Sequence, residues 1–471
     1  MSGEIRVALP RGELRDALAE QLRDVGFVPA GYGEGSRAYR FEVTGHPAVV
    51  VRVFSDRDIP IQVALGQYDL GITRSAWVDE LLVRHAQDSI VPLRPLDLGR
   101  ERLVVAAPAG TDLAALAASR VVRVATEYPH LTSRFLNRLR VPSYRLYEVW
   151  GQAQAWPPED ADVAVVPEQT LAGEDLVALA TVHEGSPWLI ANRASLATRD
   201  LASALDALLR LPMQPAPGGP VDPPPLPRTR APRLTALDER QNFRIAVPDG
   251  HAQRHTFASL ADAGIAFEGY EERAAIRRPR SSLPGVEVKV IRPQDMPMAV
   301  ALGAYDLALT GRDWLAAHLS AFPGSPVVEL ADLRRSRYSL GAVVPEDLPA
   351  DTIEEAIAYW RREDANRPIR VASEYVALAD DYARERRLGR YQVIPIAGAS
   401  EGFVPDDAEI LIEGSETGTT LRANRLRMID ITMESTNCAI GALERPAGLR
   451  GELRDQLVER LRAAAAALVV A

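Results

Sequence analysis

Short apolar runs alternate along this chain with segments whose leucines recur at helical spacing. Ile5–Leu9 is such a run, and Leu14, Leu18 and Leu22 follow it at every fourth position. A short apolar run predicts a buried strand, whereas the four-residue spacing predicts an amphipathic helix. The same reasoning predicts strands at Pro47–Phe54, Tyr68–Thr73, Leu103–Ala107 and Val121–Ala125, and helices at Ile59–Leu65 and Leu131–Arg138.

The second half repeats this order, with predicted strands at Arg244–Val247, Val286–Ile291, Leu307–Thr310, Leu340–Val344, Ile369–Ala372 and Ile410–Ile412. Strands that alternate with helices indicate an α/β fold, and we expect mostly parallel sheets. In such sheets ligands bind beyond the carboxyl ends of the strands. Three segments stand at predicted strand ends and become candidate site segments: Pro10–Gly12, Thr73–Arg74 and Glu413–Thr420.

The chain contains an internal duplication. Residues 58–73 read DIPIQVALGQYDLGIT and residues 295–310 read DMPMAVALGAYDLALT, with ten of the sixteen positions identical. Shorter matches occur in the same order on either side, so the whole unit is doubled. Nine prolines lie between Pro212 and Pro232, which predicts an extended, semi-rigid linker. We therefore expect a first copy at 1–210, a linker at 211–240 and a second copy at 241–471.

Composition narrows the classes of function. A net charge of −10 argues against general nucleic-acid binding, which needs a basic surface. Cys438 is the one cysteine, which excludes an internal disulfide and a multi-cysteine metal site and fits a reducing cytoplasm. Charged residues interrupt the N-terminal apolar run, so we expect no signal peptide. The apolar tail is too short to cross a bilayer, so we expect no membrane partner.

The most informative segment is residues 413–426, EGSETGTTLRANRL, which follows the strand Ile410–Ile412. Small and hydroxyl residues before a predicted helix at Leu421 offer backbone N–H groups and hydroxyls to an anion. Gly418 lets the backbone approach closely or take a positive φ. A phosphate is the natural ligand, although a solvated strand-to-helix turn with a threonine cap fits the composition equally well. The carboxylates Glu409, Glu413 and Glu416 suit the hydroxyls of a sugar phosphate.

Several segments resemble motifs of the ATP phosphoribosyltransferase family. They are Ala8–Gly12, Arg57–Pro60, Asp69–Thr73, Leu96–Gly99, Ala125–Thr132 and Glu416–Asn424. The resemblance covers both copies and implies two bilobed units like a type II periplasmic binding protein. It also implies a glycosyltransferase that moves the phosphoribosyl group of phosphoribosyl pyrophosphate to N1 of ATP, releasing pyrophosphate with the help of Mg²⁺. That reaction opens histidine biosynthesis.

The resemblance assigns roles to particular residues. Phosphoribosyl pyrophosphate would be bound by Glu409, Glu413, Glu416, Thr417, Gly418, Thr419, Thr420 and Leu421. ATP would be contacted by Asp69, Thr73, Tyr128, Asp306 and Thr310, although the two aspartates could equally cap adjacent turns. Glu413 would act in catalysis, together with Arg11 and Arg37 lent by the first copy. The metal ligands are left unassigned.

The two copies depart from the family's motifs in complementary ways. The first copy has Pro167–Gly173 in place of the threonine-rich loop, whereas the second has Pro248-Asp249-Gly250-His251 in place of the basic opening segment. We therefore predict a fused pseudo-dimer with one composite site per chain. Few residues follow Pro446, so we expect no built-in histidine-sensing domain and a possible regulatory subunit similar to histidyl-tRNA synthetase. The sequence leaves open whether the pseudo-dimer assembles further into a homo-oligomer.

Three alternatives remain at this stage. Because each copy lacks some of the family's catalytic motifs, the chain could be a catalytically inactive bilobed sensor or regulatory subunit. It could also be a phosphoribosyltransferase with another acceptor base. Finally, His251 and His255 are four residues apart near a predicted helix start, but no third metal ligand is apparent nearby, so a solvated polar face is the simpler interpretation.

Overall fold

The computed structural model describes residues 4–33, 38–85, 88–214, 225–226, 242–398 and 400–468. Its contacts divide the chain into two units. The first unit contains residues 1–149, 156–234 and 397–402, and the second contains residues 150–155, 235–396 and 403–471. We describe each unit by itself. Most of the predicted linker, 211–240, lies outside the described residues.

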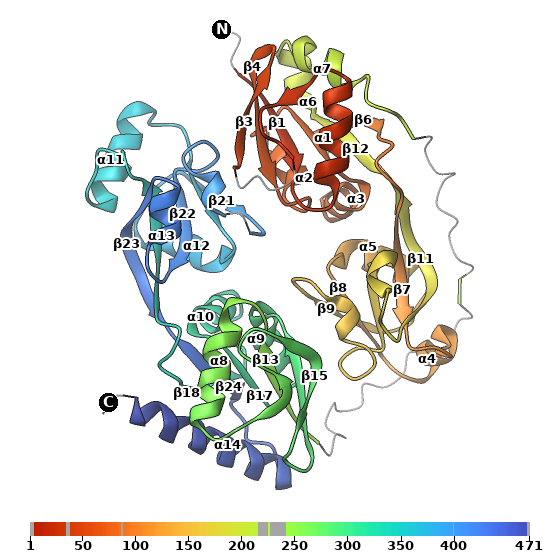
Figure 1. Ribbon diagram of the computed structural model, residues 1–471, viewed down its shortest axis with the longest axis vertical. Helices are drawn as coiled ribbons and strands as arrows, with labels where there is room; N and C mark the ends of the chain where they lie inside the picture. Colours follow the sequence, from red (N-terminus) through yellow and green to blue (C-terminus); the bar gives the residue numbers. More distant parts are fainter. Residues whose placement is uncertain are drawn as a thin grey trace. The chain divides into compact units, whose positions relative to one another are not determined.

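The first unit contains two sheets. The larger has the strand order β2 (Val28–Pro29), β3 (Arg40–Thr44), β4 (His46–Phe54), β1 (Ile5–Pro10), β5 (Leu70–Arg74), β12 (Pro187–Asn192) and β6 (Ile90–Pro95). The smaller has the order β11 (Val177–Gly185), β7 (Glu101–Ala107), β10 (Val163–Pro167), β8 (Val122–Thr126) and β9 (Tyr144–Glu148). The chain passes from one sheet to the other between β6 and β7 and returns between β11 and β12, which makes the unit bilobed (Figure 1).

The second unit repeats this topology. Its larger sheet has the order β14 (Phe267–Tyr270), β15 (Ala275–Ser281), β16 (Val286–Ile291), β13 (Phe243–Pro248), β17 (Leu307–Gly311), β24 (Asn437–Ala442) and β18 (Val327–Asp332). Its smaller sheet has the order β21 (Tyr391–Pro395), β20 (Ile369–Ser373), β22 (Ile410–Ser415), β19 (Tyr338–Pro345) and β23 (Leu426–Ser435). The sheets are therefore duplicated strand for strand, as the sequence repeat predicted.

The strand directions are more mixed than the alternation of strands and helices suggested. β1 is parallel to both β4 and β5, but β12 is antiparallel to its two neighbours, β5 and β6. Some antiparallel pairs join consecutive strands of one lobe, such as β3 with β4 and β14 with β15. Others arise because the chain crosses between lobes, so that a returning strand such as β12 enters its sheet from the opposite end. The parallel pairs lie at the centre of each larger sheet, whereas in each smaller sheet they extend to one edge, at β8–β9 and β20–β21.

Helices cover the sheets. In the first unit they are α1 (Leu14–Asp24), α2 (Ile59–Ala64), α3 (Ser75–Arg84), α4 (Leu113–Ser119), α5 (Pro129–Arg138), α6 (Arg193–Thr198) and α7 (Ala202–Leu208). In the second they are α8 (His251–Asp262), α9 (Met296–Ala301), α10 (Arg312–Ala321), α11 (Ile353–Glu363), α12 (Val376–Glu385), α13 (Thr419–Ala423) and α14 (Gly448–Ala467). Short 3₁₀ turns lie at Ala153–Ala155, Glu168–Leu171, Pro293–Asp295 and Ser400–Phe403. No helix among the described residues is long and apolar enough to cross a membrane.

Each sheet has its own apolar core, because its strands present β-branched and leucine side chains to the covering helices. In the first lobe Leu9 and Val51 pack with Leu18 and Leu22 of α1, and all four side chains are fully buried. At about 25 cal/mol per Å² of apolar surface, each such side chain contributes about 1.5–3 kcal/mol. This rigid framework fixes the loops at the carboxyl ends of the strands, where the candidate segments lie.

Candidate functional site

The threonine-rich loop connects β22 to α13. Gly418 has φ +69°, a left-handed conformation that favours glycine. Its N–H donates to Ser415 Oγ at 2.9 Å, and Thr417 Oγ1 lies 2.9 Å from Thr419 Oγ1. The helix begins at Thr419, two residues before the predicted start, because the left-handed glycine reverses the chain at that point. The three threonine side chains of the loop are exposed, whereas Leu421 is buried, so Leu421 anchors the loop by packing.

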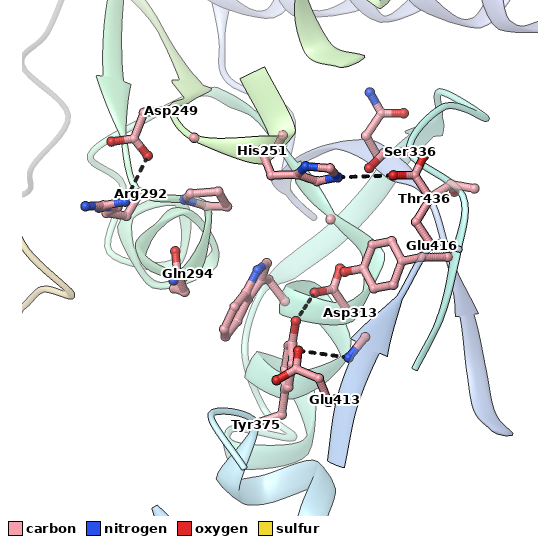
Figure 2. Close-up of a pocket in the computed structure, with 18 residues that line it drawn as sticks. Asp249, His251, Arg292, Gln294, Asp313, Ser336, Tyr375, Glu413, Glu416 and Thr436 are labelled. Atoms are coloured by element: carbon pink, nitrogen blue, oxygen red, sulfur yellow. Dashed lines mark hydrogen bonds and ion pairs between the residues drawn. The ribbon is translucent and has the colours of Figure 1, made fainter. Parts of the chain in front are cut away.

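A pocket of about 340 Å³ opens beside this loop in the second unit (Figure 2). Both lobes of the unit contribute to its lining. The larger-sheet lobe and its crossing segment provide Asp249–Ala252, Arg292–Gln294, Gly311, Asp313, Trp314, Thr436 and Asn437, and the smaller-sheet lobe provides Tyr338, Tyr375, Glu413, Gly414 and Glu416, with Ser336 just before β19. Glu413 and Glu416 thus connect the loop directly to the pocket. Glu413 Oε1 accepts a hydrogen bond from the Gly414 N–H at 3.0 Å.

A buried carboxylate organises one wall of the pocket. Asp313 is fully buried in the first turn of α10. Its Oδ2 accepts from the Tyr375 hydroxyl at 2.7 Å, and its Oδ1 accepts from the Ser435 hydroxyl at 2.9 Å. Burial, reinforced by the nearby Asp313 charge, raises the pKa of Tyr375 well above its usual value, so the phenol stays a donor. Trp314 stacks on Tyr375 with ring centroids 4.3 Å apart, which gives the pocket a fixed aromatic surface.

Three buried polar atoms near the pocket have no hydrogen-bond partner among the described residues. They are Asp249 Oδ1, Arg292 Nε and Gln294 Oε1, and all three residues line the pocket. Asp249 and Arg292 form an ion pair with a distance of 3.6 Å from Oδ1 to Nη1, longer than a hydrogen bond. Because buried polar groups in folded proteins are normally satisfied, this side of the pocket is prepared for a polar ligand.

In the first unit an ion cluster stands at the corresponding positions. Arg74 ends β5 where Gly311 ends β17, and Glu101 begins β7 where Tyr338 begins β19. The Arg74 guanidinium pairs with Glu13 at 3.0 Å, with Glu101 at 3.7 Å and with Asp56. Burial raises the pKa of Asp56 to about 6 and that of Glu101 to about 7, although Arg74 opposes both shifts.

The first unit also lacks the threonine-rich turn. After β10 the chain forms the 3₁₀ turn Glu168–Leu171. Arg102 Nη1 donates to both carboxylate oxygens of Glu168, at 2.9 and 3.1 Å, and the Thr170 hydroxyl donates to the Pro167 carbonyl at 2.7 Å. The polar side chains of this turn therefore already have hydrogen-bond partners within the first unit.

Glu409 lies away from the loop to which the sequence assigned it. It precedes β22, whereas Glu413 is in the second half of that strand. Its carboxylate accepts from the Arg370 backbone N–H at 2.7 Å and from the Arg370 side chain at 2.7 and 3.0 Å, and it also pairs with Arg367. Glu409 thus joins β22 to β20, and we leave it out of the proposed site.

Asp69 and Asp306 occupy equivalent structural positions before β5 and β17. Asp69 accepts from the Arg6 backbone N–H at 2.9 Å and from Arg199 at 2.6 Å. Asp306 accepts from the Arg244 backbone N–H at 2.9 Å and pairs with Arg450. Each aspartate closes the end of the sheet opposite to the site, so neither is carried forward as an ATP contact.

The remaining predicted residues have local roles. The hydroxyls of Thr73 and Thr310 donate to the carbonyls of Asp56 and Pro293, at 2.9 and 3.0 Å, and so fix the turns after β4 and β16. Tyr128 is buried against Trp77, at 4.1 Å between ring centroids.

Arg11 donates from its guanidinium to the Ala397 carbonyl at 3.3 Å, within the first unit as its contacts define it. Arg37 lies outside the described residues. The roles of both arginines therefore stay predictions.

Sequence reasoning missed Arg292, Gln294 and Asp313. A comparison of the two copies could have indicated Asp313, because the copies differ at this position. Gly311-Arg312-Asp313 in the second copy aligns with Arg74-Ser75-Ala76 in the first. The copy that has the threonine-rich loop is also the copy that has the glycine and the aspartate.

A model of the ATP phosphoribosyltransferase family matches residues 55–211 and 292–463, well over half of the chain. The chain belongs to the ATP phosphoribosyltransferase family. The resemblance found in the sequence, including the duplication, is thereby confirmed.

Curated relatives match at moderate identity. An ATP phosphoribosyltransferase from Saccharolobus solfataricus is 32% identical over 204 residues, which cover 43% of this chain and 64% of the relative. One from Methanothermobacter thermautotrophicus is 34% identical over 197 residues, which cover 41% and 62%. The chain thus spans slightly less than two thirds of the length of these relatives.

Among solved structures, the ATP phosphoribosyl transferase (HisG:HisZ) complex from Thermotoga maritima aligns over 48% of this chain and 99% of that chain, with 16% identity and a TM-score of 0.37. The periplasmic aliphatic sulphonate binding protein SsuA from Escherichia coli aligns over 48% and 72%, with 15% identity and a TM-score of 0.31. These scores are low, and the architecture described above rests on the sheet topology.

Proposed function

We propose that this chain is an ATP phosphoribosyltransferase whose reaction takes place in the pocket of the second unit. It would transfer the phosphoribosyl group of phosphoribosyl pyrophosphate to N1 of ATP and release pyrophosphate, the first step of histidine biosynthesis. One observation carries the proposal: in a member of this family, the loop Glu413–Thr420 borders a pocket that has unsatisfied polar groups on another side.

The chemistry asks mainly for positioning and electrostatic stabilisation. The N1–C1′ bond forms while the bond from C1′ to the pyrophosphate oxygen breaks, so negative charge develops on the leaving group. Adenine N1 already has a free lone pair and needs no general base. We assign the 5′-phosphate to the exposed hydroxyls and backbone of Thr417–Thr420, and the ribose hydroxyls to Glu413. We assign the stabilisation of the developing charge to Arg292, which lines the pocket.

Mg²⁺ fits the residues at this end of the pocket. Glu413 and Glu416 provide the carboxylate oxygens that a hard cation prefers, and Mg²⁺ commonly keeps several waters and shares substrate phosphates. When bound, it would offset the negative charge of the pyrophosphate. We place these two carboxylates beside the metal, and the aromatic surface of Trp314 and Tyr375 beside the adenine.

We further propose one active pocket per chain. Support comes from the first unit, where Arg74 is surrounded by carboxylates and Glu168 is paired with Arg102. A second phosphoribosyl group would find no threonine-rich turn there. A cytoplasmic location fits this biosynthetic role.

The direct test compares matched threonines of the two units. Thr419→Ala and Thr420→Ala should each lower pyrophosphate release from ATP and phosphoribosyl pyrophosphate by about 10- to 100-fold, because a hydrogen bond to a charged group contributes about 1.5–3 kcal/mol. Thr170→Ala is the control and should retain activity. Equal losses in all three variants would contradict the single-pocket proposal.

Calorimetric titration separates this function from its rivals. With Mg²⁺ present, we expect one phosphoribosyl pyrophosphate per chain. A stoichiometry of two would mean that the first unit also binds, and an absence of binding would favour a sensor that has lost catalysis. Binding without ATP-dependent pyrophosphate release would indicate a different acceptor base.

We also propose that histidine regulation, where present, comes from a separate subunit similar to histidyl-tRNA synthetase. The name of the Thermotoga maritima complex records a two-component assembly. The purified chain alone should therefore show little inhibition by histidine in the pyrophosphate-release assay, and strong inhibition would refute the idea.

A further inference from the structure

Two histidines and a glutamate meet at the rim of the pocket. His251 and His255 lie one turn apart at the start of α8, so their side chains share a face of the helix. Glu416 reaches them from the threonine-rich loop of the other lobe. One oxygen or nitrogen atom from each residue lies within 4.8 Å of the other two. The sequence left this third group unseen, because Glu416 is remote from the histidines along the chain.

The distances are close to those of a metal site. His251 Nε2 lies 3.4 Å from Glu416 Oε2, and His255 Nε2 lies 4.0 Å from Glu416 Oε1 (Figure 2 shows the first pair). Ligands at about 2.0–2.1 Å from a tetrahedral metal are about 3.4 Å from one another. Because the three ligand atoms lie within 4.8 Å of one another, side-chain adjustments of roughly 1–1.5 Å would bring them to this spacing.

Without a metal, Arg254 occupies this position. Its Nη2 donates to Glu416 Oε2 at 3.1 Å, and its Nε donates to His255 Nε2 at 3.0 Å. The arginine thus uses the same lone pairs that a cation would use. Its side chain is half exposed, so it can move into solvent at small cost.

We propose that His251, His255 and Glu416 bind one divalent transition metal of the zinc class, with the fourth position open to the pocket. Two imidazoles with one carboxylate suit Zn²⁺ or Co²⁺, whereas Mg²⁺ prefers oxygen ligands alone. The bound metal would link α8 to the threonine-rich loop and so connect the two lobes of the second unit. Glu416 is also one of the two carboxylates proposed to lie beside Mg²⁺, so the two metals would share this side chain, but the histidine site does not depend on the proposed reaction.

The test uses the purified full-length chain and Co²⁺, whose visible absorption reports tetrahedral ligation. The wild type should bind one Co²⁺, and excess Zn²⁺ should displace it. His255→Ala and Glu416→Gln should each weaken binding by at least about 10- to 100-fold, since even residues that only support metal ligands have effects of this size. Circular dichroism of the metal-free variants checks that they are folded.

Two further variants make the test specific. Arg254→Ala should bind Co²⁺ several-fold more tightly, because the competing cation is gone. His85→Ala removes an exposed histidine elsewhere and should leave binding unchanged. The proposal is overturned by the absence of saturable binding, or by binding that is the same in Glu416→Gln as in the wild type, since a pair of surface histidines would then account for it.

Discussion

Replacing Asp313 by alanine should destabilise the second unit. The substitution removes the acceptor of both the Tyr375 and Ser435 hydroxyls, whose hydrogen bonds to the carboxylate are 2.7 and 2.9 Å long. A buried donor left without an acceptor costs about 1–3 kcal/mol, so two cost about 2–6 kcal/mol. Relief from burying a charge offsets part of this. We therefore expect a net loss of about 2–4 kcal/mol.

Hydrogen exchange measured by mass spectrometry on peptides that cover α10 is the suitable assay, because a chain with two units need not unfold in one step. Asp313→Asn keeps one acceptor oxygen and should lose about half as much stability, which gives the order wild type, Asn, Ala. Asp351→Ala, at an exposed position, is the control.

A loss below about 0.5 kcal/mol in Asp313→Ala would refute the reasoning. It would mean that the hydroxyls find other acceptors or that the carboxylate's desolvation cancels its hydrogen bonds. A double-mutant cycle with Ser435→Ala distinguishes these cases, because only a real Asp313–Ser435 interaction gives a coupling energy.

Three further predictions concern stability. Burial raises the pKa of Glu101 to about 7, so this carboxyl binds its proton more tightly in the folded protein than in the unfolded chain. The first unit should therefore lose stability as the pH rises from about 4.5 through 7. Glu101→Gln should reduce this dependence of the melting temperature on pH in thermal melts. Glu409→Ala should cost about 3–5 kcal/mol, because it removes the carboxylate that pairs with the buried Arg370. Calorimetry on the folded variant should nevertheless find the affinity for phosphoribosyl pyrophosphate unchanged, and a selective loss of affinity would return Glu409 to the site. Gly341→Ala should destabilise by about 1–3 kcal/mol in urea unfolding, because its Cβ would lie 2.2 Å from the Asp430 carbonyl oxygen, whereas Gly324→Ala, in open space, should be nearly neutral.

Much of the architecture could be read from local pattern. The predicted strand Val286–Ile291 matches β16 residue for residue, and Pro47–Phe54 differs from β4 by one residue. Such segments are predictable because apolar alternation and β-branched side chains act over a few neighbouring residues. The duplication and the family are also properties of the sequence itself, because both follow from matches along the chain.

The site depended on contacts that no local pattern encodes. Glu409 and Glu413 are four residues apart, and the sequence predicts that both bind the hydroxyls of a sugar phosphate. The fold nevertheless places Glu409 before β22, against Arg370, and Glu413 in the pocket. Sequence spacing measures distance along a strand, but a strand of this length separates its two ends by more than 10 Å.

The sequence alone therefore determined the α/β class, the repeat, the family and the threonine-rich loop. The tertiary structure decided which polar groups are committed to ion pairs and which face the pocket. It paired Asp313 with Tyr375, and it brought Glu416 to the two histidines of α8. These contacts join residues from different lobes or from elements far apart in the sequence. They form only because the packed cores fix the position at which each strand ends.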